Sequence, residues 1–130
     1  MTDNMDQMIE DAALSFSGIY SMKLDSKGRL SVPSQYRKLM VSRNNKFASV
    51  VYLQKNTYKE RPALSVFDAY ALTGLAYPDF SSLDRQIIDM QGRIILKPDQ
   101  ISYAKLIPDV SFVASTDGTH LVIIPKESNL

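Results

Sequence analysis

Two arginines, Arg29 and Arg93, each directly follow the same four-residue pattern, Asp-x-x-Gly. In such a pattern the Asp carboxylate can accept a backbone amide two residues on, and Gly supplies a positive φ that other side chains disfavour, so a tight turn is predicted. A guanidinium attached to a rigid turn has a fixed direction, and its planar fork suits an anionic partner. The predicted turn-forming residues are Asp25, Gly28, Asp89 and Gly92.

The two patterns form an internal repeat, because Asp25 and Asp89 are 64 residues apart in a chain of 130 residues. Each copy continues into a short strand-like segment and then reaches a proline, Pro33 or Pro98, which suits the first turn of a helix. Each copy therefore predicts a strand, a turn, a second strand and a short helix. A plain hairpin explains one copy, whereas two copies favour an arginine that is positioned for binding.

The rest of the chain predicts a mainly β fold with short helices, of the α+β class. We expect an acidic mobile or loosely helical arm over residues 1–15, a first half over 16–67, a connector over 68–82 and a second half over 83–130. Residues 42–46 read as a polar connection after the first helix, and residues 55–62 as a charged loop. The predicted strands cover residues 16–24, 29–32, 47–54, 63–67, 83–88, 93–96, 109–115 and 120–124, and the predicted helices cover residues 34–40 and 98–106.

Charge is distributed unevenly along a chain whose formal net charge is only +1. Residues 16–46 hold seven Lys and Arg against Asp25 alone, while residues 1–15 hold four carboxylates and no Lys or Arg. A concentrated basic segment is typical of a protein with a polyanionic partner, although a solvated surface gives the same pattern.

Several functional classes are not supported by the residues present. The chain has no cysteine, which excludes disulfides, thiol catalysis and cysteine zinc sites. Its single histidine, His120, has no partner for a Ser-His-Asp arrangement, and no metal-ligand cluster or Gly-rich phosphate loop is present. We therefore expect no enzyme activity, cofactor, metal or small-molecule substrate. With no apolar run of eighteen residues and no secretory signal, we expect a cytoplasmic protein without a membrane partner.

Residues 24–33 with Tyr36 and Arg37, together with residues 89–98, resemble the MraZ family of bacterial transcription regulators. Each half of such proteins is similar to the swapped-hairpin fold of SpoVT/AbrB-type DNA-binding domains. The resemblance covers about residues 16–124 and implies two half-repeats that form one pseudo-twofold swapped-hairpin β-barrel. It also implies a nucleoid-associated homo-oligomer, such as a ring, that represses division and cell-wall genes by binding tandem promoter repeats. The acidic arm is an addition to the family pattern, and the connector is shorter than the family's helical segment.

The resemblance implies that Arg29 and Arg93 face double-stranded DNA. We expect the two turns to lie side by side and each arginine to bind guanine O6 and N7 or to clamp a phosphate. Further predicted DNA-binding residues, which would mainly attract phosphates, are Lys23, Lys27 and Arg37. The alternative is an oligomeric protein-interaction or scaffold ring in which the turns only shape the barrel, with no DNA sequence preference.

Overall fold

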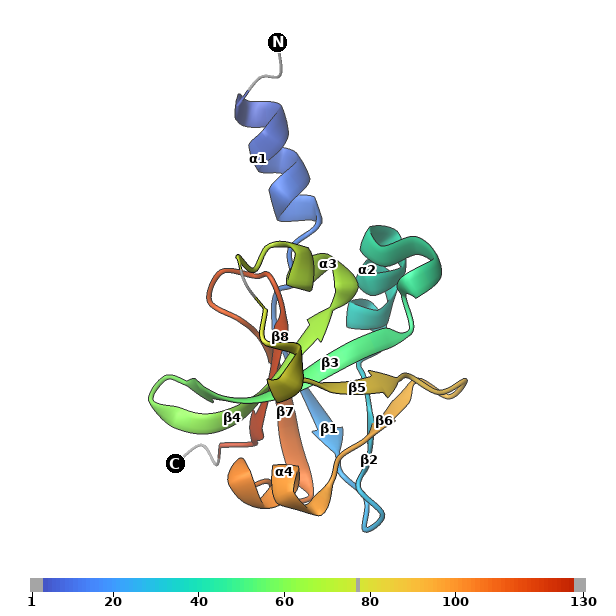
Figure 1. Ribbon diagram of the computed structural model, residues 1–130, viewed down its shortest axis with the longest axis vertical. Coiled ribbons are helices and arrows are strands. Elements are labelled where there is room, and N and C mark those ends of the chain that lie inside the picture. Colours follow the sequence, from blue (N-terminus) through green and yellow to red (C-terminus); the bar gives the residue numbers. More distant parts are fainter. Residues whose placement is uncertain (1–3, 77, 128–130) are drawn as a thin grey trace.

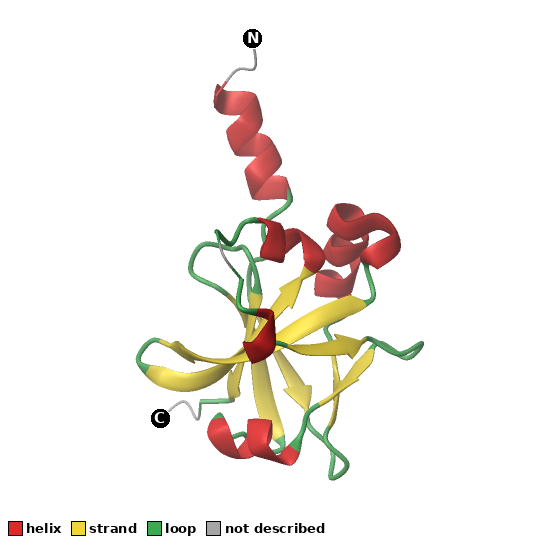
Figure 2. Ribbon diagram, viewed as in Figure 1, coloured by secondary structure: helices red, strands yellow, loops and turns green. Residues whose placement is uncertain are grey.

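A six-stranded antiparallel sheet forms the centre of the molecule, with a separate two-stranded sheet beside it, in a computed structural model that describes residues 4–76 and 78–127 (Figures 1 and 2). The strand order is β1-β7-β8-β4-β3-β5 in the large sheet and β2-β6 in the small one. The fold is therefore mainly β, as the sequence predicts. The strands are β1 (Ile19–Lys23), β2 (Arg29–Ser31), β3 (Val50–Tyr58), β4 (Arg61–Asp68), β5 (Asp84–Ile87), β6 (Arg93–Ile95), β7 (Asp109–Ala114) and β8 (Leu121–Pro125).

Short helices lie at the two ends of the sheet, and one helix stands apart from it (Figure 2). The helices are α1 (Asn4–Ala13), α2 (Ser34–Asn44), α3 (Ala69–Thr73) and α4 (Pro98–Tyr103), with 3₁₀ turns η1 (Asn45–Phe47) and η2 (Phe80–Ser82). Helix α1 falls within the expected arm and projects away from the sheet (Figure 1). Within the described ranges, no helix is both long and apolar enough to cross a membrane.

The two halves of the chain interlock in the large sheet. The first strand of the first half, β1, pairs with β7 of the second half, while β5, the first strand of the second half, pairs with β3 of the first. Between them, β4 and β8 pair across the middle of the sheet, where Ser65 lies opposite Val122. Each half thus places its opening strand against the closing hairpin of the other half.

The small sheet is built in the same reciprocal way. Leu30 of β2 pairs with Ile94 of β6, its counterpart 64 residues later. The carbonyl of each turn glycine accepts a backbone amide just after the other half's short strand. These bonds are Val32 N to Gly92 O at 2.9 Å and Leu96 N to Gly28 O at 2.8 Å.

Helix α2 is longer than expected and corrects the prediction of a polar connection over residues 42–46. The helix continues to Asn44 because the side-chain amide of Asn44 donates from Nδ2 to the carbonyl of Met40 at 2.9 Å and to the buried carboxylate of Asp68 at 2.8 Å. On its inner face Tyr36 and Met40 are buried. Tyr36 also donates from its hydroxyl to the Gly18 carbonyl at 2.9 Å, which joins the helix to the start of β1.

The predicted loop over residues 55–62 is wrong, because most of it belongs to a long hairpin. Strand β3 continues to Tyr58 and β4 begins at Arg61, so only Lys59 and Glu60 form the turn. Both turn residues have a positive φ, of 49° and 67°. Two-residue hairpin turns of this shape favour Gly or Asn, and the absence of both residue types hid the turn in the sequence.

Candidate nucleic-acid interface

The first predicted turn is held together by its own carboxylate. Asp25 Oδ1 accepts the backbone amides of Lys27 at 2.9 Å and Arg29 at 2.8 Å, while Oδ2 accepts Arg29 Nε at 2.6 Å. Gly28 has a φ of 80° and donates its amide to the Asp25 carbonyl at 3.1 Å. The carboxylate therefore fixes both the backbone of the turn and the base of the guanidinium.

The second turn repeats these contacts. Asp89 Oδ1 accepts the amides of Gln91 and Arg93, both at 2.9 Å, and Oδ2 accepts Arg93 Nε at 3.0 Å. Gly92 again has a φ of 80°. The duplicated pattern in the sequence is thus a duplicated structure, down to the carboxylate oxygen that each donor uses.

Both turn carboxylates are held in the charged form. The backbone amide of Arg29 lowers the pKa of Asp25, and burial opposes this shift only in part; the Arg29 side chain and the Lys27 amide lower the pKa further. The same order of causes, with the Arg93 amide first, lowers the pKa of Asp89. Each arginine therefore has an ionised partner at neutral pH.

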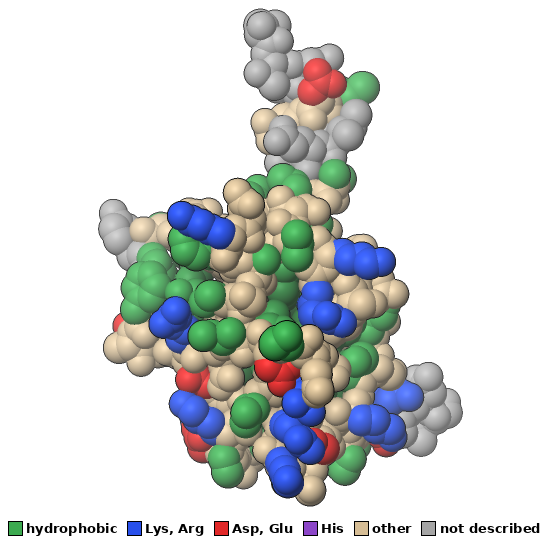
Figure 3. Space-filling model, turned by 90° about the vertical axis from the view of Figure 1, so that its right-hand side faces the viewer, with side chains coloured by type: hydrophobic (Ala, Val, Ile, Leu, Met, Phe, Trp, Pro, Cys, Tyr) green, Lys and Arg blue, Asp and Glu red, His purple; other side chains and the backbone are tan. Residues whose placement is uncertain are grey.

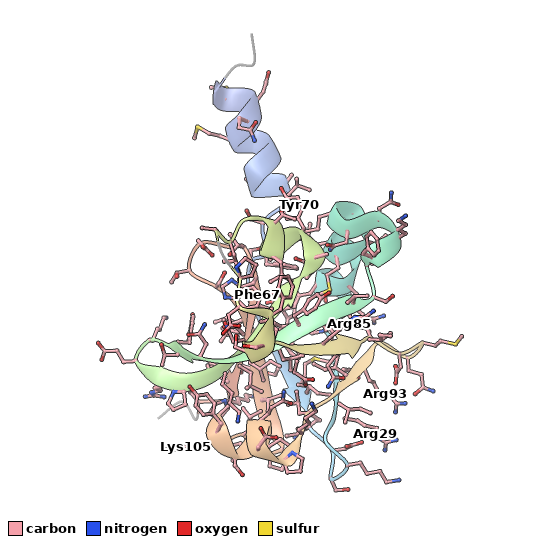
Figure 4. The ribbon with its side chains drawn as sticks, viewed as in Figure 1. Arg29, Phe67, Tyr70, Arg85, Arg93 and Lys105 are labelled. Atoms are coloured by element: carbon pink, nitrogen blue, oxygen red, sulfur yellow. The ribbon has the colours of Figure 1, made fainter. Side chains whose placement is uncertain are left out.

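Arg29 and Arg93 project from one face of the β2–β6 sheet. In the strand register Arg29 lies opposite Ile95 and Arg93 lies opposite Ser31, which makes the arginines diagonal neighbours, roughly 7–8 Å apart along the ladder. Figure 4 shows both side chains on the same side of the molecule. Their side chains are 38% and 30% exposed. Within the described part of the chain, the two terminal nitrogens of each guanidinium have no hydrogen-bond partner.

The expectation that the two turns lie side by side needs a correction. Strands β2 and β6 are antiparallel, and each turn precedes its strand, so the turns extend from opposite ends of the small sheet (Figure 1). The arginines meet on its outer face, while the turn tips diverge. The candidate nucleic-acid interface is therefore this outer face together with the two flanking turns.

Comparisons with known proteins decide the family. No family model matches the chain. Three curated proteins named Transcriptional regulator MraZ are similar to it: those of Rhodococcus opacus (34% identity over 113 residues), Mycolicibacterium smegmatis (34% over 113) and Corynebacterium kroppenstedtii (30% over 112). Each match covers 78% of this chain and 76% of the relative. The chain belongs to the MraZ family of transcriptional regulators.

The two lysines that the sequence predicts as DNA-binding residues of this MraZ-family chain lie near the first turn. Lys27 is part of the turn and is exposed. Lys23 is at the end of β1, where its ammonium pairs with Asp109 and its side chain is 79% exposed. In the second half of the repeat Gln91 replaces Lys27 and Ile87 replaces Lys23. The first turn is therefore the more basic of the two.

Arg37 contacts the second turn from α2. Its Nε donates to the Val32 carbonyl at 3.0 Å, and a Cβ placed on Gly92 would lie 2.6 Å from the Arg37 Cζ atom. Arg37 is half-buried, and its guanidinium lies against that glycine. Arg37 therefore supports the second turn, and its role as a DNA contact stays a prediction.

A further basic residue of this surface, Arg85, is not among the DNA-binding residues that the sequence predicts. Arg85 occupies an exposed position of β5, and Figure 4 shows it on the same side as Arg29 and Arg93. Figure 3 views that side directly, and its lower part gathers Lys and Arg side chains with a few carboxylates between them. Residues 84–87 read Asp-Arg-Gln-Ile, without alternation of apolar and polar side chains, so the sequence does not indicate that Arg85 faces this surface.

Arg43 is not part of the basic surface, although it belongs to the predicted basic segment. Its side chain is 1% exposed and forms an ion pair of 2.9 Å with Asp68, whose side chain is 0% exposed. Its guanidinium also donates to the carbonyls of Leu14 at 2.8 Å and Thr119 at 2.9 Å. Burial lowers the pKa of Arg43, and the Asp68 charge opposes that shift. Arg43 is therefore a structural residue that joins three segments.

His120 also has a structural setting. Its ring lies against Phe67, with 4.4 Å between ring centroids, and its Nδ1 is 3.0 Å from the Thr119 hydroxyl. Burial lowers the pKa of His120 despite the nearby charges of Asp117 and Asp68. Among the residues that the structure describes, no three His, Cys, Asp or Glu side chains form a group that could hold a metal ion.

Proposed function

We propose that this chain is a sequence-specific DNA-binding transcriptional regulator that presents Arg29 and Arg93 together to double-stranded DNA. The observation that carries the proposal is the matched geometry of the two arginines. Each is held at Nε by the carboxylate of its own turn, at 2.6 and 3.0 Å, on one exposed face. An arginine held at Nε keeps its two terminal nitrogens available as a pair of donors.

Paired donors suit the edge of guanine in the major groove, where O6 and N7 are adjacent acceptors. They also suit two oxygens of one phosphate. Asp25 and Asp89 orient the arginines in this proposal and do not contact the anionic DNA. Phosphate attraction that is independent of sequence would come from Lys23, Lys27 and Arg85.

We further propose that the interlocked strands form a pseudo-twofold swapped-hairpin barrel of two SpoVT/AbrB-like halves. The pairing of β1 with β7 and of β5 with β3 supports this interpretation. The pairing of Leu30 with Ile94, at equivalent positions of the repeat, supports it as well. In this arrangement the barrel places the arginine of each half on a shared surface.

A single barrel reads few base pairs, so the proposal includes a homo-oligomer, such as a ring, that binds tandem promoter repeats. Linked sites raise the effective concentration of each neighbouring barrel and supply affinity without new contacts. Repression of division and cell-wall genes from such repeats is the regulatory role that the MraZ resemblance supports.

The test is a binding titration with DNA selected by the protein from a randomised duplex library. Duplexes with one copy, two tandem copies and a shuffled sequence are compared at two salt concentrations. We expect tighter binding to the tandem duplex than to the single copy, weak binding to the shuffled control and a log-linear loss of affinity with salt. A scaffold ring without DNA sequence preference would yield no enriched sequence and equal binding to all three duplexes.

A further inference from the structure

Helix α1 carries apolar and acidic residues on a helix that stands away from the rest of the molecule. Met5 and Met8, three residues apart and hence on one face, are 65% and 70% exposed. The helix sequence also contains Asp6, Glu10 and Asp11 and has no Lys or Arg. Figures 1 and 3 show α1 projecting from the body in two perpendicular views. A helix of ten residues is marginal in water by itself, so a surface that covers it would stabilise it.

A groove with apolar and basic lining residues lies on another part of the molecule, between the β3–β4 hairpin and the end of α4. Its volume is about 550 Å³. The apolar lining includes Ile19, Pro62 and Ile124, and beneath it Ala63, Val113 and Val122 form a small buried cluster. The basic residues of the lining are Lys59, Arg61 and Lys105.

The charge of the groove is only partly neutralised. Among the lining residues that the structure describes, the single carboxylate is Glu127, which pairs with Arg61 at 2.7 Å. Lys105 is exposed at the end of α4, and Lys59 lies over the Tyr58 ring at 5.3 Å. An apolar groove with excess positive charge fits an acidic helix that carries exposed methionines.

Helix α1 points away from the groove of its own chain. The segment after the helix is fixed by Arg43, which donates to the Leu14 carbonyl, and by the bond of 2.8 Å from Phe16 N to Gly118 O. The helix leaves the body at one end, while Lys105 lies near the other end (Figures 1 and 4). Docking within one chain would break the contacts that hold this segment.

We propose that α1 of one copy of this chain docks into the Lys59–Lys105 groove of a second copy. This contact rests on the homo-oligomer of the proposed function. Because helix and groove are different surfaces, it is head-to-tail and extends to a ring or an open chain. Figure 4 shows Lys105 on the opposite side of the molecule from Arg29 and Arg93, so the docked helix leaves their surface open.

Cross-linking between two single-cysteine variants of the full chain tests this contact directly, because the natural sequence has no cysteine. Met8→Cys protein is mixed with Ile19→Cys protein and treated with a short bismaleimide. The matched control is Ile87→Cys, an isoleucine that is 63% exposed on edge strand β5, compared with 72% for Ile19 on edge strand β1. We expect mixed dimers of Met8→Cys with Ile19→Cys and only background with Ile87→Cys.

A second measurement follows self-association of full-length variants by sedimentation velocity over a concentration series. Met8→Asp should raise the dissociation constant about tenfold or more, since it removes the burial of a Met side chain. Lys105→Glu should also weaken assembly, while Lys38→Glu, the same charge change on the exposed side of α2, should not. Equal cross-linking to Ile19→Cys and Ile87→Cys would overturn the proposal. An intramolecular cross-link in a Met8→Cys/Ile19→Cys double variant, or assembly unchanged by Met8→Asp and Lys105→Glu, would also overturn it.

Discussion

Leu30 lies opposite Ile94 in the β2–β6 sheet, and the two residues are 0% and 1% exposed. The pair occupies equivalent positions of the internal repeat, so the two halves meet there with opposite strand directions. Each arginine lies one residue before its member of this pair and therefore projects from the other face of the sheet. A buried contact between two equivalent residues thus places Arg29 and Arg93 on one surface.

The turn carboxylates should affect DNA discrimination more than overall DNA affinity. In Asp25→Asn and Asp89→Asn variants the amide oxygen can still accept the backbone amides, but the arginine loses its charged partner at Nε. We expect selected DNA to bind less tightly and shuffled DNA to bind equally or more tightly, since one negative charge is removed. The measurement is the ratio of the two affinities at one salt concentration. An unchanged ratio would show that the carboxylates do not orient the arginines for sequence recognition.

The free energy of unfolding should decrease in acid, partly because Asp117 becomes protonated. Hydrogen bonds from Thr119 and Ser115 lower the pKa of Asp117 to about 2. A group with a lowered folded-state pKa stabilises the fold above its ordinary pKa of 3.8, and this contribution is lost as the pH falls toward 2. Urea unfolding between pH 6 and pH 2 should show a smaller acid loss in Asp117→Asn. The control Glu60→Gln removes one charge at the β3–β4 turn and should keep the parent profile; identical profiles for all three proteins would contradict this prediction.

The two turn glycines should tolerate alanine unequally. Both have a φ of 80°, which costs roughly 1–2 kcal/mol for a residue with a side chain. At Gly28 a Cβ would lie 2.5 Å from the Leu96 carbonyl oxygen, which is part of the backbone, whereas at Gly92 it would meet the Arg37 side chain, which can move. Urea unfolding should show a larger loss for Gly28→Ala than for Gly92→Ala.

A double-mutant cycle tests the contact between Gly92 and the Arg37 side chain. Arg37→Ala should reduce the cost of Gly92→Ala, because it removes the atoms that the new Cβ meets. It should leave the cost of Gly28→Ala unchanged. Equal costs at both glycines, with no coupling to Arg37, would contradict the turn geometry described above.

Breaking the buried ion pair should destabilise the chain strongly. Arg43→Ala leaves the Asp68 carboxylate buried without its cation, and such changes cost about 3–5 kcal/mol. The control is Arg61→Ala, whose ion pair with Glu127 has side chains 70% and 60% exposed and should cost at most about 1 kcal/mol. Adding Asp68→Ala to Arg43→Ala should cost less than Asp68→Ala alone. Similar urea midpoints for Arg43→Ala and Arg61→Ala would show that Arg43 does not join the N-terminal segment to the fold.

Local features of this chain could be predicted because the residues that determine them are close in sequence. Asp25, Gly28 and Arg29 form a turn by themselves, and the second copy repeats the same contacts. The apolar alternation of the strands and the prolines at the starts of α2 and α4 are equally local signals. The turns, the mainly β class and the approximate strand positions therefore followed from the sequence.

The remaining features depend on distant partners. Arg43 is buried because Asp68 and the carbonyls of Leu14 and Thr119 surround it, and none of these lies near it in the sequence. The divergence of the two turns depends on the antiparallel pairing of β2 with β6. The surface position of Arg85 depends on β5 being at the edge of the sheet. A single sequence does not contain these pairings in a readable form.

The central claim is that Arg29 and Arg93 act together on one DNA site. The most direct test is the affinity of Arg29→Ala, Arg93→Ala and the double variant for a single copy of the selected duplex. Lys46→Ala, at an exposed position of η1, serves as the charge control, and circular dichroism confirms folding. We predict a loss of about 1–3 kcal/mol for each arginine, whereas Lys46→Ala should keep the parent ratio of affinities for selected and shuffled DNA. Parent-level binding by the double variant would contradict the account.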